Sequence, residues 1–179
     1  FWAEYESYRI WQKSGQVLAG VILGLAMGSL FGIVYALSRN SLPGKNDVTK
    51  SVILAGIMWL TIYIIPFLKY PANPPTVGDG ETVMLRAILY VSFIALSGIG
   101  VVIFYKLSQK LQNNKKYFGL FGYVIFIIIL FFVMPENPDE ITAPMNLVNE
   151  FRFMSVLGVS SFWLSVGLIL GLFWKKFEK

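Results

Sequence analysis

Long apolar stretches alternate with short polar ones along this chain, and the alternation predicts an all-α membrane protein. Five apolar segments occupy about 15–38, 48–68, 85–105, 117–134 and 153–174. A helix needs roughly 20 apolar residues, at about 1.5 Å rise per residue, to cross a bilayer. The fourth segment is the shortest, but it contains no charged residue. The pattern therefore predicts a polytopic helix bundle with five transmembrane helices, forming a single membrane domain over residues 1–179.

Charged residues divide unequally between the two sides that five crossings define. One side receives residues 1–14, loop 69–84 and loop 135–152, and, with Arg86 just after the second of these, carries five basic and eight acidic residues. The other side receives loop 39–47 with its flank, loop 106–116 and the C-terminus, and carries ten basic and two acidic residues. Because cytoplasmic loops are enriched in Lys and Arg, we expect the second side to be cytoplasmic. The first side, with net charge 5 − 8 = −3, is then outside.

The N-terminal segment 1–14 has aromatic residues at every third position, namely Trp2, Tyr5, Tyr8 and Trp11. Amphipathic rings of this kind favour the membrane interface. The segment is interpreted either as an interfacial helix or as the first turns of a tilted first span. The chain begins with Phe1 instead of Met, and we expect a sixth transmembrane helix before residue 1.

The amino-acid composition limits the kinds of metal site and catalysis that this chain can support. Hydrophobic residues make up 56% and charged residues 14% of the chain, and there is no cysteine and no histidine. This excludes a disulfide framework, a thiolate metal cage and histidine-based catalysis, and we expect no tight metal site, no cofactor and no enzyme activity. The aromatic residues do not lie among basic stripes, so nucleic acid is not an expected partner, whereas membrane lipid is.

The first apolar segment carries glycine at exact four-residue spacing: Gly20, Gly24, Gly28 and Gly32. Residues four apart share one helix face, so these glycines predict a groove that another helix backbone can approach closely. Packing against a helix of the same chain and an interface with a second copy or a partner are both compatible with the stripe. A helix before residue 1 would be a natural occupant.

The segment from Pro66 to Val83, here called the proline segment, separates the second and third apolar segments. Proline fixes the backbone and restricts the residue before it. One interpretation is a stiff connector. The other is a rigid outer mouth, where Asn73, Asp79 and Glu81 offer oxygen to a cation. The residues that would shape the loop in either case are Pro66, Lys69, Pro71, Pro74 and Pro75.

The other predicted outer loop, 135–152, is also acidic. Carboxylates raise the local concentration of cations without forming a tight site, although an ordinary solvated loop has the same composition. Arg152 stands at the entry to the last span, where it can close the core instead of meeting solvent. The acidic candidates of this loop are Glu136, Asp139, Glu140 and Glu150.

The stretch "FLKYPANPPTVGD" resembles the segment that identifies the CbtA family of membrane proteins, described as probable cobalt transporter subunits. The flanking "GIMWLTIYIIPFLKYPANPP" resembles the family's helix that leads into this segment. "RAILY" is similar to the start of its next helix, and "FRFMSVLG" to the entry to its last. The resemblance covers most of the chain, and the proline motif is its specific part.

The resemblance implies a multi-pass protein of the prokaryotic inner membrane that takes part in cobalt uptake. It also implies a small single-span partner of the CbtB type with a histidine-rich end, which would supply the nitrogen ligands that this chain lacks. The function we expect is that of an integral membrane subunit for uptake of cobalt or another divalent cation. The alternative is a structural or accessory subunit of a larger membrane complex without transport activity of its own.

Overall fold

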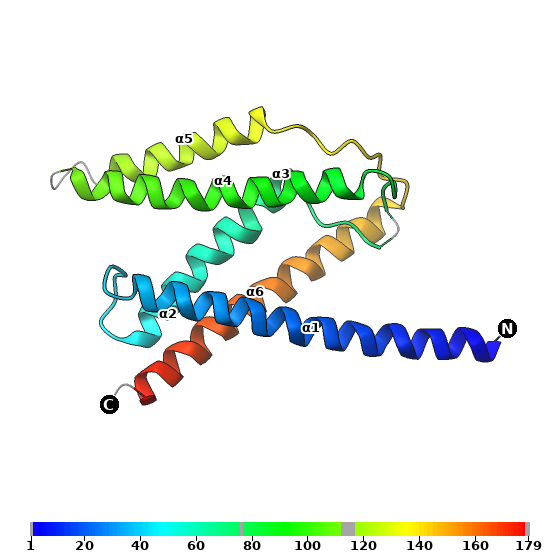
Figure 1. Ribbon diagram of the computed structural model, residues 1–179. Helices are drawn as coiled ribbons and strands as arrows, with labels where there is room; N and C mark the ends of the chain where they lie inside the picture. Colours follow the sequence, from blue (N-terminus) through cyan, green and yellow to red (C-terminus); the bar gives the residue numbers. More distant parts are fainter. Residues whose placement is uncertain (1, 76, 112–116, 178–179) are drawn as a thin grey trace. The chain divides into compact units, whose positions relative to one another are not determined.

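The structure is a computed structural model that describes residues 2–75, 77–111 and 117–177, with side chains from residue 5 onward (Figure 1). Within these residues the chain is helical and has no strand, which confirms the all-α prediction. The helices are α1 (Trp2–Ser38), α2 (Asp47–Met58), the π-helix η1 (Trp59–Ile64), α3 (Ile65–Lys69), α4 (Val83–Lys110), α5 (Tyr117–Val133) and α6 (Met145–Phe177).

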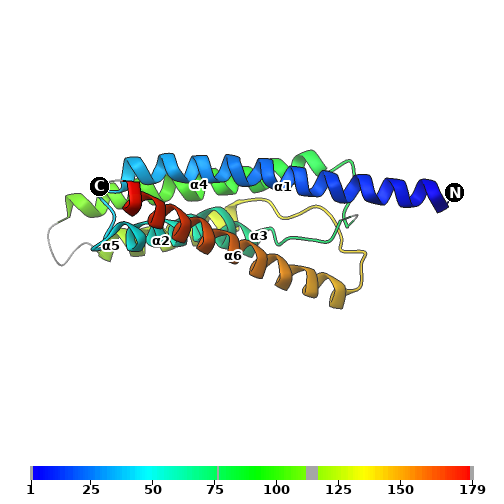
Figure 2. The same ribbon diagram turned by 90° about the horizontal axis from the view of Figure 1, so that it is seen from below.

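Four helical stretches in the described residues are long and apolar enough to cross a membrane. They are Tyr5–Ser38, Asp47–Lys69, Val83–Lys110 and Met145–Phe177, and α5 is a shorter apolar helix of 17 residues. These helices agree with a polytopic membrane bundle, and α5 has the shortest length that spanning helices show, about 17 residues. Figure 2 shows α1 as one uninterrupted helix, so the described residues before Gly15 are its first turns.

The chain divides into two compact units, each described here by itself. The first unit comprises residues 1–55 and 165–179, and the second comprises residues 56–164. Helices α2 and α6 contribute residues to both units, whereas α4 and α5 belong to the second alone. The prediction of a single membrane domain stays a prediction.

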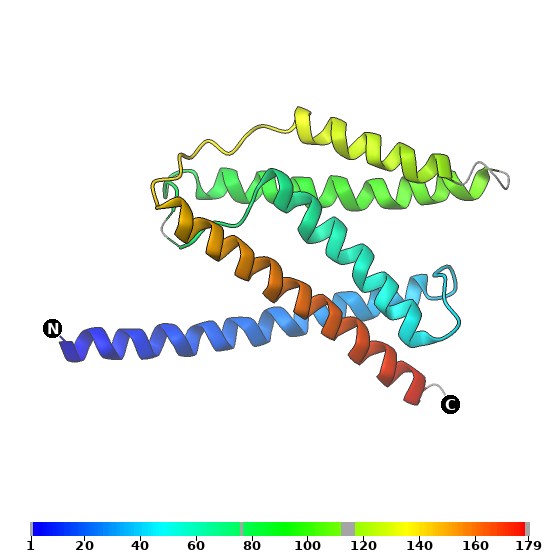
Figure 3. The ribbon, with the colours of Figure 1, turned by 180° about the vertical axis from the view of Figure 1, so that it is seen from behind.

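Helix α2 continues through η1 into α3 as one helical rod (Figure 3). In η1 the hydrogen bonds reach one residue further back than in an α-helix, as the bond from the Ile65 N–H to the Leu60 carbonyl shows. Pro66 follows directly and has no N–H to donate, which removes one bond of the regular α-helical ladder at this point. The wider turn presents Trp59 and Tyr63 to α6, where they bond to Ser160 and Ser155 at 3.1 and 2.9 Å.

In the first unit, small residues allow α2 and α6 to approach closely. The buried Ser51 hydroxyl donates to the Gly167 carbonyl at 2.7 Å. A Cβ added at Gly167 would lie 2.8 Å from the Ala55 side chain, and one added at Gly171 would lie 2.6 Å from the Val48 Cα. Glycine is therefore required at both positions for this approach.

The end of α1 joins the same unit through polar and aromatic contacts. The fully buried Tyr35 donates its hydroxyl to an Asp47 carboxylate oxygen at 2.9 Å, and the Arg39 Nε lies 2.6 Å from the same oxygen. The Trp174 ring meets the Tyr35 ring edge to face at 5.1 Å between centroids, and the Arg39 guanidinium lies over it at 5.6 Å. One aromatic and ionic cluster thus holds three helix ends together.

In the second unit, α4 and α5 lie side by side (Figure 1). Glycine again sets the distance, because a Cβ at Gly122 would lie 2.6 Å from the Phe104 ring and one at Gly100 would lie 2.7 Å from the Phe126 ring. The hydroxyls of Ser97 and Tyr123 form a hydrogen bond of 3.0 Å between the two helices. The proline segment, which connects α3 to α4, belongs to this unit as well.

Candidate functional site at the proline segment

The path of the proline segment follows from its proline and glycine residues. Helix α3 ends where the Tyr70 N–H donates to the Pro66 carbonyl at 2.7 Å. A turn follows in which the Val77 N–H donates to the Pro74 carbonyl at 3.2 Å. Gly78 then has a φ of 100°, a conformation that residues with a side chain rarely adopt. The chain therefore reverses at Gly78 and enters α4 at Val83.

Asp139 of loop 135–152 is the main anchor of this turn, and its side chain is only 7% exposed. One carboxylate oxygen accepts the Asp79 N–H at 2.9 Å, and the other accepts the Thr82 hydroxyl at 2.7 Å. The Arg86 Nε forms an ion pair with the first oxygen at 3.0 Å. Both oxygens of Asp139 are therefore engaged within the protein.

Arg86, in the first turn of α4, connects Asp139 to the backbone of the proline segment. Its Nη2 donates to the Asp79 carbonyl at 2.8 Å, and its Nη1 lies 3.5 Å from the Val77 carbonyl. A Cβ at Gly78 would collide with both the Asp139 carboxylate and the Arg86 guanidinium. A side chain at residue 78 would therefore push Arg86 and Asp139 apart. Separation of such a pair is costly, because it leaves a charge without its partner.

A second arginine holds the extended part of the segment from α6. The Arg152 Nε donates to the Ala72 carbonyl at 3.2 Å, and its Nη2 donates to the Asn73 side-chain oxygen at 2.9 Å. Arg152 is half-buried, and its expected role in closing the core stays a prediction. The Asn73 oxygen, which was a candidate cation ligand, accepts a hydrogen bond from Arg152 in this structure.

Two aromatic contacts fix the start of the proline segment. The Tyr70 hydroxyl donates to the Pro135 carbonyl, which joins the proline segment to loop 135–152, and its ring meets the Phe93 ring edge to face. Burial raises the pKa of the Tyr70 hydroxyl above its usual range, so the group stays protonated and remains a donor. The Lys69 ammonium lies over the Phe131 ring, 4.9 Å from its centroid.

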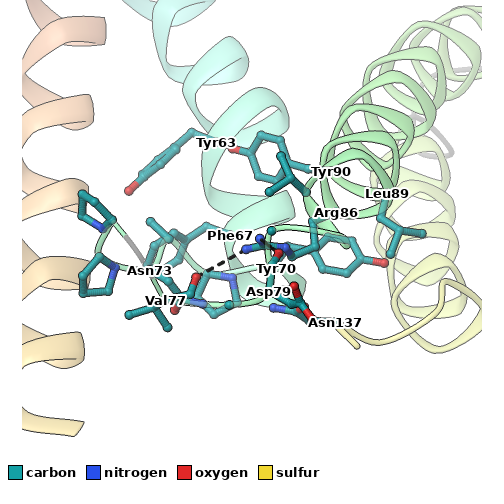
Figure 4. A pocket seen from close by; sticks show the side chains of 17 residues that line it. Tyr63, Phe67, Tyr70, Asn73, Val77, Asp79, Arg86, Leu89, Tyr90 and Asn137 are labelled. Carbon is teal, nitrogen blue, oxygen red and sulfur yellow. Dashed lines mark hydrogen bonds between the residues drawn. The ribbon is translucent and has the colours of Figure 1, made fainter. Parts of the chain in front are cut away.

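A cavity of about 690 Å³ lies between the proline segment, η1, α3 and the first turns of α4 (Figure 4). Its wall combines aromatic rings and prolines with a few polar side chains. The lining residues are Tyr63, Phe67, Tyr70, Pro71, Ala72, Asn73, Pro74, Pro75, Val77, Gly78, Asp79, Gly80, Val83, Arg86, Leu89, Tyr90 and Asn137. All of them belong to the second unit.

The remaining predicted site residues are five acidic residues of the loops and the four glycines of α1. The acidic side chains of Glu81, Glu136, Glu140 and Glu150 are exposed, as is Asp79. Among the described residues, no group of three or more Asp, Glu, His or Cys side chains could hold a metal ion. The four glycines of the α1 stripe have open space, because a Cβ at Gly20, Gly24, Gly28 or Gly32 would meet no atom within 4 Å.

The sequence interpretation did not assign a role to Arg86. The sequence contains one weak indication of a role for Arg86. It is a single arginine in the first turn of a predicted helix, directly after a turn rich in glycine and acidic residues. Its partner Asp139 was considered only as one of several acidic residues in another loop. An arginine at a helix entry is common, and nothing in the local pattern shows which distant carboxylate it meets.

The long apolar helices define a multi-pass membrane protein, and a polar loop held by side-chain hydrogen bonds connects two of them. The chain matches the model of the CbtA family, described as "Probable cobalt transporter subunit (CbtA)", over residues 2–175. Because this match covers nearly the whole chain, the protein belongs to the CbtA family, and the resemblance seen in the sequence is confirmed. No match was found among curated proteins or among solved structures.

Proposed function

We propose that this protein is the integral membrane subunit of an uptake system for cobalt or a similar divalent cation, and that the proline segment forms its outer entrance. The observation that carries the proposal is the fixation of this segment in a member of a cobalt transporter family. Arg86, Arg152 and Asp139 hold it from three different parts of the chain. A mere connector between two helices does not require such fixation.

In this proposal the polar residues of the outer loops divide into two roles. Asn73 and Asp139 maintain the shape of the entrance, because their side-chain oxygens accept hydrogen bonds from the protein. The exposed carboxylates, such as Glu81 and Glu140, attract cations by long-range electrostatics, which act over about 8 Å at physiological ionic strength. Attraction of this kind raises the local cation concentration without a tight site.

The orientation in the membrane rests on the ten basic residues of the expected cytoplasmic side. The chain has no cysteine, so single cysteines can be introduced without background. We expect Glu81→Cys and Glu140→Cys to react with an impermeant thiol reagent in intact cells, and Lys45→Cys and Gln109→Cys to react only after lysis. Labelling of Gln109→Cys in intact cells would overturn the orientation and the proposed outer entrance.

The direct test is uptake of radioactive cobalt by cells that express the full-length protein at matched membrane abundance. Glu81→Gln/Glu140→Gln removes two exposed charges, and Pro74→Ala/Pro75→Ala alters the stiffness of the segment. We expect both double variants to reduce uptake by about two- to tenfold, the charge variant chiefly at low cobalt and low salt. Glu6→Gln, a change of the same kind on α1, is the control. Wild-type uptake by the charge variant would contradict the role of the carboxylates.

The accessory role remains the second candidate function, favoured by the missing metal-ligand cluster in the described part of the chain. In either case we propose a membrane partner of the small, single-span, histidine-rich CbtB type, which would contribute nitrogen ligands. Purification in mild detergent distinguishes the two. Recovery of such a subunit together with cobalt uptake supports transport, whereas a stoichiometric complex of unrelated subunits without uptake supports the accessory role.

A further inference from the structure

The cavity beside the proline segment has a wall that is unusual for a site meant to hold a bare metal ion. Four aromatic rings line it, those of Tyr63, Phe67, Tyr70 and Tyr90, together with three prolines of the segment. Figure 4 shows these rings around the cavity, with Arg86 reaching in from α4. Aromatic and aliphatic walls with a few polar groups are typical of sites for small organic molecules.

The polar groups of the cavity supply few oxygen atoms to a metal. Asp79 is the only carboxylate among the described residues of its wall, and one of the two oxygens already accepts the Glu81 N–H at 3.0 Å. The side-chain oxygens of Asn73 and Asn137 accept hydrogen bonds from Arg152 and from the Asp139 N–H. A divalent cation that loses its hydration shell needs about six ligands, which these groups do not provide.

The volume of the cavity also favours an organic ligand over a hydrated ion. A hydrated divalent ion with six waters needs roughly 180 Å³ for those waters, at about 30 Å³ each. The cavity, at about 690 Å³, is several times larger and lies within the range of about 300–1,000 Å³ found for organic ligands. Hydrated ions also gain little from aromatic walls that cannot replace the hydrogen bonds of their water.

The charges in and around the cavity restrict the ligand further. Within the cavity wall the charges of Asp79 and Arg86 have opposite sign and balance each other. Outside it, exposed carboxylates such as Glu81 and Glu140 favour the approach of a positively charged species. Aromatic faces attract a positive charge as well. The best fit is therefore an organic species of low positive charge.

We propose that this cavity binds the transported metal as a complex with an organic ligand, and that this complex carries a small positive charge. The inference rests on the proposed uptake function and specifies the form of its substrate. It also agrees with a chain that contains no histidine and no cysteine, because the organic ligand brings its own nitrogen donors. The rings of the cavity recognise that ligand, and the metal itself makes no bond to the protein.

Two inert cobalt(III) complexes test this proposal with the purified full-length protein in lipid nanodiscs. Bis(histidinato)cobalt(III) is a monocation with two imidazole rings, and hexaamminecobalt(III) is a compact trication that resembles a hydrated ion. Equilibrium dialysis, with bound cobalt measured by mass spectrometry, gives both affinities. We expect the histidine complex to bind at least about tenfold more tightly, and its binding to depend little on salt.

Tyr90 is the ring to remove, since its hydroxyl makes no hydrogen bond to another described residue. We expect Tyr90→Leu to weaken binding of the histidine complex by about three- to tenfold. Val83→Trp adds bulk at the exposed edge of the cavity and should weaken binding as well. The matched control is Tyr117→Leu on α5, an exposed tyrosine that does not line the cavity.

Equal affinity for the two complexes, or unchanged binding by both cavity variants, would overturn the proposal. Binding of bare cobalt(II) with no binding of the histidine complex would overturn it too, and would show that this chain holds the ion with its own ligands. The proposed uptake function can fail independently. Cells that accumulate cobalt through a protein that does not bind the histidine complex retain the function and refute the inference. Binding without any uptake of cobalt in cells refutes the function.

Discussion

Helices α1 and α6 both carry glycine at four-residue spacing, but they use it differently. On α1 the stripe Gly20–Gly32 has open space beside it, and an added Cβ would meet no atom within 4 Å. On α6, Gly167 and Gly171 lie against α2, where an added Cβ would come within 2.8 and 2.6 Å of its atoms. Within the first unit the more regular pattern contacts no other helix, and the shorter pair is the one that sets a helix–helix distance.

Small residues on one helix are therefore not enough to predict that it packs closely against another helix. A stripe of glycine permits close approach, but the facing helix must offer small residues too. Helix α2 does so at Ser51 and Ala55, which are both buried. Along α1 the packed residues are instead Phe31 and Tyr35, which are large and fully buried. Complementarity between two faces decides the packing, and one helix alone does not contain that information.

The largest expected effect is at Gly171. Leucine there would drive a side chain into the Val48 backbone, so we expect Gly171→Leu to cost at least about 3 kcal/mol of stability and to abolish folded yield. Gly171→Ala should cost about 1–3 kcal/mol. The measurement is thermal unfolding in detergent, with recovery from size-exclusion chromatography. Gly158→Leu on the same helix is the control, because a Cβ there meets nothing within 4 Å. Normal recovery of Gly171→Leu would show that α2 and α6 separate without loss of the fold.

The packed end of α1 provides a second, smaller effect. Tyr35→Phe removes a hydrogen bond of 2.9 Å to the Asp47 carboxylate but keeps the ring against Trp174. Hydrogen bonds to charged groups contribute about 1.5–3 kcal/mol, and we expect a loss near the lower value because Arg39 still pairs with Asp47. Unfolding by denaturant, compared with the exposed Tyr8→Phe, checks it. An unchanged midpoint would mean that ring packing alone holds this end.

Ser51→Ala examines the polar part of the contact between α2 and α6. It removes the hydrogen bond of 2.7 Å to the Gly167 carbonyl while keeping the residue small. Hydrogen bonds between membrane helices contribute about 0.6 kcal/mol on average, so we expect a loss of about 0.6–1 kcal/mol. Ser161→Ala is the matched control, because that hydroxyl bonds to a carbonyl of its own helix. Equal losses in the two variants would leave no specific role for the interhelical bond.

The smallest loss of stability is expected in the α1 stripe. Gly24→Leu and Gly28→Leu place side chains in open space, so the isolated chain should lose no stability and should gain up to about 1 kcal/mol from the higher helix propensity of leucine. A partner helix that uses this face would be lost from the purified complex at unchanged stability, whereas Gly→Ala would retain it. If the leucine variants fail to fold, the stripe packs within the chain. If they fold and keep every partner, the stripe faces lipid.

The proline segment shows a similar division between what could and could not be predicted. Its position between two apolar helices follows from its prolines, and the place of Arg152 at the entry to α6 follows from the apolar run after it. The ion pair between Arg86 and Asp139 could not be predicted, because Arg86 lies in the first turn of α4, Asp139 lies in a distant loop, and no local periodicity relates them. The π-helix before Pro66 could not be predicted either, since an apolar stretch is compatible with both α-helical and π-helical hydrogen bonding.

The sequence by itself determined the class of the protein, the approximate helices and the family. Hydrophobicity and charge act locally and add along the chain, so long apolar runs and basic loops need no partner to be recognised. Only the tertiary structure decided which glycines pack, which carboxylate is buried and where the cavity lies. Those features depend on pairs of surfaces that meet across long separations in sequence. Asp139 illustrates the reason, because its role comes entirely from Arg86, Thr82 and Asp79, which the fold brings to it.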